Sequence, residues 1–178
     1  PSDLAACLNT AGRGGIIKKG ETTNAIQQAR IARSRMFAND RPAFLAKLRK
    51  EIQAHVRRAQ RHGLRPAVRL NGTSDLPFER IAPEIFAEFP NVRFYDYTKS
   101  DKRMLRQRRA DWPANYSLTF SRSETNEPAS LAVLAAGHNV AVVFQKALPE
   151  YWEGFPVVDG DKHDLRFLDP VGGFVVGL

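Results

Sequence analysis

The sequence predicts an α/β fold in which a parallel sheet is built from repeated βα units. Four short runs rich in apolar and β-branched residues recur about 24 residues apart, and helical stretches separate them. Polar clusters directly follow three of these runs. Because parallel neighbours need a crossover of a dozen or more residues, usually helical, this alternation favours a parallel sheet over an antiparallel meander. We expect an incomplete or irregular (β/α) barrel, with a doubly wound open sheet as the alternative.

Residues 1–65 are expected to form a glycine-rich loop followed by two helices. The first helix is predicted over residues 23–37. For the second, Asp40 can cap, Pro42 suits the first turn and Gly63 can end it. Its apolar residues fall three or four apart and form one stripe: Phe44, Leu45, Leu48, Ile52, Val56 and Ala59. The rest of this helix is basic.

The βα repeats are predicted to occupy residues 66–178, so the whole chain forms one domain. The four strands are expected at residues 67–70, 92–95, 116–120 and 140–144, with weaker candidates at 156–158 and 174–178. Helices are expected at residues 77–89, 100–109 and 128–136. The start at Pro1 and the final apolar run are typical of a fragment, so residues could be missing from either end of the site.

The composition is that of an ordinary globular domain with one core, since 43% of the residues are hydrophobic and 26% are charged. Cys7 is the single cysteine, which excludes an internal disulfide and favours a reducing compartment. No run reaches the roughly 20 apolar residues of a membrane span. We therefore expect a cytoplasmic protein without a membrane partner.

The positive charge gathers in one part of the chain. The formal net charge is +8, and residues 30–65 hold eleven Lys or Arg against two acids. Such a surplus attracts polyanions through phosphate contacts, so nucleic acid is the expected partner; a solubilising helix face is the alternative. The expected contacts are Arg49, Lys50, Arg57, Arg58 and Arg61 on the second helix, with Arg103 and Arg106 beyond the second strand.

The polar strand ends are the predicted site, because ligand sites of parallel α/β folds form at the carboxyl ends of strands. Asp75 and Asp96 follow successive strands and could act as nucleophile and general acid or base. This pair suits glycosidic chemistry at a nucleoside, as in a base-exchanging transglycosylase. Ligand or phosphate contacts are expected from Asn71, Lys99, Ser121, Arg122 and Ser123, and base stacking from Tyr95, Tyr97 or Trp112.

Each of these residues also has a structural interpretation. Asp75 could cap the next helix, and Asp96 could form an ion pair with Lys99 or Arg93. Arg122 could pair with Glu124. The serines, threonines and asparagine are common turn residues.

A divalent metal is a further candidate cofactor. Asp159, Asp161 and His163 offer oxygen and nitrogen ligands of the kind that Mg²⁺ or Mn²⁺ takes, which would suit a metal-dependent nuclease. The alternative is a tight turn around Gly160.

Four blocks of the chain, in the same order, resemble a phage and plasmid family related to the mycobacteriophage proteins called gene product 88. The blocks are Ala6–Gly14, Val68–Asp75, Phe94–Lys99 and Leu118–Ser123. The resemblance implies a phage or mobile-element context, in which many small basic proteins act on nucleic acid. Two hypotheses follow: a nucleic-acid-directed enzyme, or a non-catalytic effector that binds nucleic acid or a host protein.

Overall fold

The structure, a computed structural model, describes residues 16–17, 19–20, 22–105 and 112–178. The chain divides into two compact units, residues 1–57 and 58–178.

The first unit contains helix α1 (Ala25–Asn39) and most of helix α2 (Arg41–Arg61). Asn24 caps α1 by accepting a hydrogen bond from the backbone N–H of Gln27 at 2.9 Å. The carboxylate of Asp40 accepts one from the N–H of Ala43 at 3.0 Å, so the predicted cap of the second helix is confirmed. Gly63 has a φ of +65°, the left-handed conformation that commonly follows a helix end.

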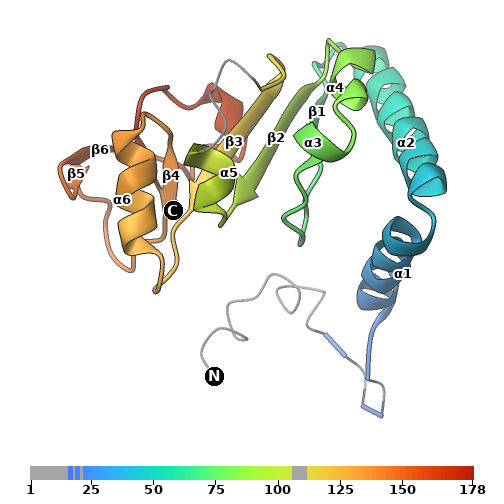
Figure 1. The fold of residues 1–178 in the computed structure, drawn as a ribbon, viewed down its shortest axis with the longest axis horizontal. Helices are drawn as coiled ribbons and strands as arrows, with labels where there is room; N and C mark the ends of the chain where they lie inside the picture. The colour runs from blue at the N-terminus through green and yellow to red at the C-terminus, as the bar shows by residue number, and fades with distance from the viewer. Residues whose placement is uncertain (1–15, 18, 21, 106–111) are drawn as a thin grey trace. The chain divides into compact units, whose positions relative to one another are not determined.

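A seven-stranded, mostly parallel sheet forms the second unit (Figure 1). Its spatial order is β1-β2-β3-β4-β7-β6-β5. The strands are β1 (Ala67–Arg69), β2 (Arg93–Thr98), β3 (Tyr116–Ser121), β4 (Val140–Val142), β5 (Tyr151–Trp152), β6 (Phe155–Asp159) and β7 (Val175–Gly177). All neighbouring pairs are parallel except β5 and β6. The prediction of an α/β fold with a mostly parallel sheet is therefore confirmed.

The antiparallel β5–β6 hairpin is not part of the sequence prediction. Its turn places Glu153 and Gly154 at φ values of 51° and 82°. A strand of two residues carries no alternation that could be recognised in the sequence, and Pro156 weakens the signal of its partner.

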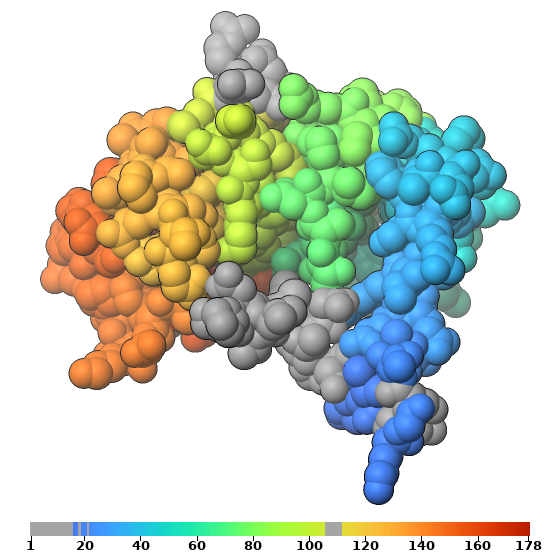
Figure 2. All heavy atoms as spheres, turned by 60° about the horizontal axis from the view of Figure 1, so that its bottom comes forward, coloured from blue at the N-terminus to red at the C-terminus, as the bar shows by residue number. Residues whose placement is uncertain are grey.

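One face of the sheet is covered by short helices. These are α3 (Phe78–Ile81), α4 (Glu84–Glu88), α5 (Asp101–Leu105) and α6 (Glu127–Ala135), and Figure 2 shows α3, α5 and α6 next to one another on this face. The single helix predicted over residues 77–89 is wrong, because the chain leaves the helical conformation at Ala82, just before Pro83. Proline disfavours a helical residue before it and cannot donate a backbone hydrogen bond.

Alternate side chains of β2 lie on opposite faces of the sheet, as the strand period of two requires. Phe94 packs edge to face on Phe86 of α4, with ring centroids 5.0 Å apart. Tyr95 packs on Phe167, whose 3₁₀ helix η3 (Arg166–Leu168) lies at the other face, at 5.8 Å. Asp96 therefore projects toward the helix face.

Candidate functional site

The polar ends of β1 and β2 meet, as the sequence predicts. The backbone N–H of Asn71, just after β1, donates to Asp96 Oδ1 at 2.7 Å, and its side-chain Nδ2 donates to Asp96 Oδ2 at 3.0 Å. The other side-chain atom of Asn71, Oδ1, accepts from the N–H of Leu76 at 2.9 Å. Asn71 thus ties the turn after β1 to β2. Asp96 lies within this strand and not after it, because β2 extends to Thr98 and not only to residue 95 as predicted.

Asp96 is a buried carboxyl group, with 0% of its surface exposed. Besides Asn71, the hydroxyl of Tyr116 donates to Asp96 Oδ2 at 3.3 Å. Burial raises the pKa of Asp96 to about 6, and the hydrogen bonds from Asn71 limit this rise. The observed hydrogen-bond partners of Asp96 are Asn71 and Tyr116. They stand in place of the ion pair with Lys99 or Arg93 that the sequence offered as an alternative.

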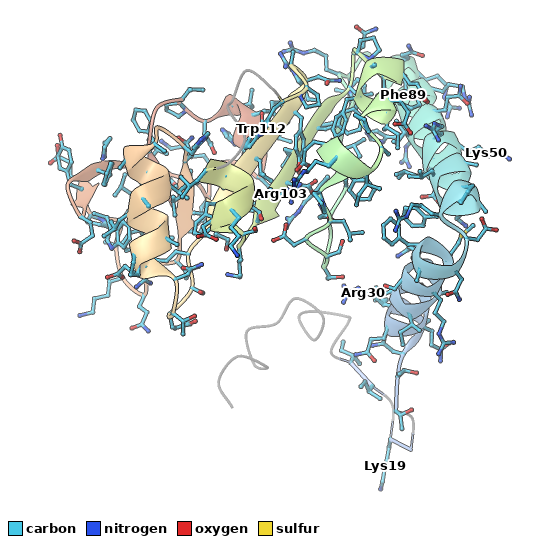
Figure 3. The ribbon with its side chains drawn as sticks, in the orientation of Figure 1. Lys19, Arg30, Lys50, Phe89, Arg103 and Trp112 are labelled. Atoms are coloured by element: carbon cyan, nitrogen blue, oxygen red, sulfur yellow. The ribbon has the colours of Figure 1, made fainter. Side chains whose placement is uncertain are left out.

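Arg103 of α5 is the centre of a second set of contacts (Figure 3). Its Nε and Nη2 donate to the two carboxylate oxygens of Glu79 at 2.8 and 2.7 Å, a bidentate ion pair. Its Nη1 donates to Asp75 Oδ1 at 2.6 Å, and its Nη2 also donates to Tyr116 Oη at 2.8 Å. Arg103 is 6% exposed and is paired with these two acids. It is therefore not available to a nucleic-acid phosphate, contrary to the prediction.

Asp75 does not cap the helix that follows it. The N-cap of α3 is Pro77, and no side chain makes a capping hydrogen bond there. Instead, Asp75 Oδ2 accepts from the hydroxyl of Thr98 at 2.8 Å and from the N–H of Lys99 at 3.0 Å. Asp75 and Asp96 belong to one hydrogen-bonded network through Arg103 and Tyr116, but Asp75 is the more exposed of the two. We call the residues joined by these contacts the strand-tip network: Asn71, Asp75, Glu79, Asp96, Arg103 and Tyr116.

The end of β3 joins the same edge of the sheet through Lys99. Its ammonium group donates to Ser121 Oγ at 3.2 Å and to the carbonyl of Arg122 at 3.4 Å. The Arg122 guanidinium pairs with Glu127 of α6 at 2.5 Å rather than with Glu124, and the backbone N–H of Ser123 donates to Asn126 Oδ1. Lys99 and Ser121 therefore lie together, while Arg122 is engaged by a helix acid.

The three aromatic residues considered for base stacking are not gathered at the strand-tip network. Tyr95 and Tyr97 project from the opposite face and donate to the carboxylate of Asp164 at 3.4 and 3.2 Å. Trp112 precedes β3 and so lies at the amino end of the strands (Figure 3). Its ring stacks on His138 at 5.8 Å.

The basic side of α2 is exposed, as its sequence pattern predicts. Lys50, Arg57, Arg58 and Arg61 are exposed, and Arg49 is half-buried. The apolar stripe is partly or fully covered, with Ile52 and Ala59 buried. We call Lys50, Arg57, Arg58 and Arg61 the basic face of α2.

A family model described as gene product 88 matches residues 4–178. The chain belongs to the gene product 88 family. This confirms the resemblance predicted from the four sequence blocks and supports a phage origin. No curated protein and no solved structure matches the chain.

The acidic turn of this gene product 88 family member is not arranged as a metal site. Among the described residues, no three His, Cys, Asp or Glu side chains gather closely enough to hold a metal ion, so Asp159, Asp161 and His163 are not brought together as ligands. Asp159 Oδ1 accepts from the N–H of Asp161 at 3.0 Å. The N–H of Gly160 donates to the carbonyl of Gly177 in β7 at 2.8 Å. These bonds fit the tight turn that the sequence predicts as the alternative.

Some sequence predictions fall outside the described residues: Arg106, Cys7 and the glycine-rich loop. None of the helices in the described part of the chain has the length and apolar character needed to cross a membrane.

Two members of the strand-tip network are not predicted from the sequence. Glu79 is a buried acid in the first turn of α3, and Tyr116 opens β3. Glu79 is 24 residues from Arg103, so no local spacing relates them. A helix acid and a strand tyrosine give no signal in the sequence, because both are common in structural positions.

Proposed function

We propose that this gene product 88 family member binds nucleic acid through the basic face of α2, in the cytoplasm of the host cell. The observation that carries the proposal is the separation of the helix into a covered apolar stripe and an exposed face bearing Lys50, Arg57, Arg58 and Arg61. Phosphates bound by such side chains release counterions, which supplies affinity without requiring a particular base sequence.

The positive charges near the end of α2 also have a purely structural explanation, and the experiment must distinguish it from nucleic-acid binding. Arg58 and Arg61 lie in the last turn of the helix, where a positive charge is favourable beside the exposed carbonyls. That effect contributes to helix stability but gives no affinity for phosphate. A change in binding without a matching change in thermal stability supports the proposal.

The experiment compares two triple variants of equal charge. Arg57→Gln, Arg58→Gln and Arg61→Gln remove three charges from the basic face of α2, whereas Arg80→Gln, Lys146→Gln and Lys162→Gln remove three exposed charges elsewhere. Fluorescence polarisation measures binding to labelled duplex DNA, single-stranded DNA and RNA at one salt concentration. We expect the α2 variant to bind at least about tenfold more weakly and the control to change about twofold or less. Equal reductions of affinity in the two variants would contradict the proposal.

The second candidate is a nucleic-acid-directed enzyme, in its most specific form a base-exchanging transferase, whose centre is the strand-tip network. It is favoured by the meeting of Asn71, Asp75 and Asp96 at one edge of the sheet and by the raised pKa of Asp96. Asp75 is the better nucleophile candidate, since its carboxylate is partly exposed and Asp96 is not. Lys99 would contact phosphate.

Mass spectrometry of the nucleosides released from DNA or RNA, after incubation with the protein, tests this candidate. Asp75→Asn should abolish any base modification or base removal while leaving nucleic-acid binding within about twofold. Glu124→Gln, at an exposed carboxyl group, is the matched control. Unaltered product formation by Asp75→Asn would exclude the assigned role.

We also propose that the sheet curves as it does in an incomplete (β/α) barrel. The helices α3, α4, α5 and α6 lie on one face of the sheet (Figure 1). A barrel places its helices on one side of the strands, whereas a doubly wound sheet places them on both. These four α-helices lie on one face and only the short 3₁₀ helix η3 of the second unit's described helices lies at the other, which favours a barrel-like curvature over a doubly wound sheet.

A further inference from the structure

A cavity of about 540 Å³ lies where the parallel strands begin, and it shares Tyr116 with the strand-tip network. Its lining includes residues where parallel strands begin, namely Ala67, Arg93 and Tyr116, and the segment around η3. All of its lining residues belong to the second unit. The volume falls in the range of pockets that hold small organic molecules.

The walls of this cavity combine positive charge with aromatic rings. Arg65, Arg93 and Arg166 line it, against one acid, Asp169, which pairs with Arg166 at 3.4 Å. The aromatic contribution comes from four lining residues: Trp112, Tyr116, His138 and Phe167. Guanidinium groups favour phosphate, and rings favour a planar apolar body.

Two lining residues carry hydrogen-bond donors without an acceptor in the described part of the chain. The indole Nε1 of Trp112 is buried and has no partner; Nη1 of Arg166 also has none, but it lies beside Gly160, which is not part of the lining. Arg166 is a buried residue with 3% exposure, and its Nη2 donates to the carbonyls of Gly160 and His163. A buried donor without a partner is costly, so an acceptor from outside the chain, either water or a ligand, is expected at each of these atoms.

We propose that this cavity binds a nucleoside monophosphate, with the phosphate at the arginines and the base among the aromatic residues. Inorganic phosphate alone would leave most of the volume and all of the rings unused. An uncharged aromatic molecule would leave the arginines without an anion. The nucleotide is either free or the 5′-phosphorylated end of a strand. The cavity lining shares no residue with the basic face of α2, so this proposal does not depend on the proposed function.

Isothermal titration calorimetry of the full chain tests the proposal with AMP, adenosine and inorganic phosphate as separate probes. We expect AMP to bind at least about tenfold more tightly than either of the other two. A pair of oligonucleotides of one sequence, with and without a 5′-phosphate, distinguishes the free nucleotide from the strand end. Preference for the phosphorylated oligonucleotide over AMP assigns the strand end; equal affinity for the two oligonucleotides assigns the free nucleotide.

Two variants and one control locate the binding. Trp112→Phe keeps an aromatic ring but removes the unpartnered N–H, and Arg93→Gln removes one cavity charge. Each should weaken AMP binding about tenfold, whereas Arg80→Gln, outside the cavity lining, should leave it within about twofold. The triple variant of α2 should bind AMP like the parent chain, so failure here and failure of the proposed function are distinguishable.

The proposal is overturned if AMP gives no saturable heat up to about 5 mM, or if Arg80→Gln weakens binding as much as Arg93→Gln. If Trp112→Phe unfolds the chain, Arg93→Gln still decides, because Arg93 is an exposed side chain that donates a long hydrogen bond of 3.3 Å to the carbonyl of Ala114.

Discussion

The side chain of Asp96 combines a property of catalytic groups with a property of structural ones. Its raised pKa is expected of a general acid or base. Its complete burial, with donors from Asn71 and Tyr116, is expected of a residue that fixes two strand ends. The carboxyl group of Asp96 has no exposed surface, whereas that of Asp75 is partly exposed, so Asp75 is the better candidate for direct contact with a substrate.

The pKa of Asp96 predicts a pH dependence of stability. The folded value of about 6 lies above the ordinary value of 3.8, so the folded chain binds more protons between these limits. The stabilising contribution is therefore fully present below about pH 3.8 and is lost as the pH rises through about 6. A shift of this size corresponds to at most about 3 kcal/mol.

Urea denaturation at pH 4, 5, 6 and 7 measures this effect. Asp96→Asn should flatten the decline of unfolding free energy between pH 4 and 6, even if it lowers stability throughout. Asp161→Asn, at an exposed carboxyl group, should retain the decline of the parent chain. An Asp96→Asn profile parallel to that of the parent would show that another group titrates.

Among the elements, β7 has the position that depends most on distant parts of the chain. It lies between β4 and β6, pairing Val140 with Val175 and Val157 with Val175. Gly173, just before it, has a φ of +85°, and a Cβ added there would lie 2.7 Å from the carbonyl oxygen of Leu134. Glycine is required at this position both by the backbone conformation and by the contact with α6.

Substitution of two glycines separates these two causes. Gly154 has a similar φ of +82° but open space around the added Cβ. Gly154→Ala should cost about 1 kcal/mol of unfolding free energy from backbone conformation alone, and Gly173→Ala should cost roughly 2 kcal/mol or more beyond that, since overpacking adds to it. Chemical denaturation of the two variants provides the comparison. Equal costs would mean that α6 moves away freely.

At the scale of the whole molecule, the charge is distributed unevenly. The net charge is +8, and the basic excess coincides with residues 30–65. A polyanion bound at such a region is held by an interaction that weakens steeply with salt.

The salt dependence of nucleic-acid binding should therefore identify the region that binds. For the parent chain, log K should fall linearly with log salt concentration, and the triple variant of Arg57, Arg58 and Arg61 should reduce the slope by roughly 0.9 for each phosphate that it no longer neutralises. Fluorescence polarisation at four salt concentrations measures the slopes. The control variant of Arg80, Lys146 and Lys162 should keep the parent slope; a matching reduction there would indicate diffuse attraction by net charge.

The sequence by itself determined the parallel βα alternation, the amphipathic α2 with its Asp40 cap and Gly63 end, and the convergence of Asn71, Asp75 and Asp96. These features depend on local periodicity, capping chemistry and the rule that parallel strands end at a common edge, all of which are evident from neighbouring residues. Three features were decided by the tertiary structure alone. They are the partners of Arg103, namely Glu79 and Tyr116, the position of β7 in the sheet, and the cavity at the amino ends of the strands. Those contacts join residues far apart in the chain, so burial and ion pairing between them leave no periodic trace in the sequence.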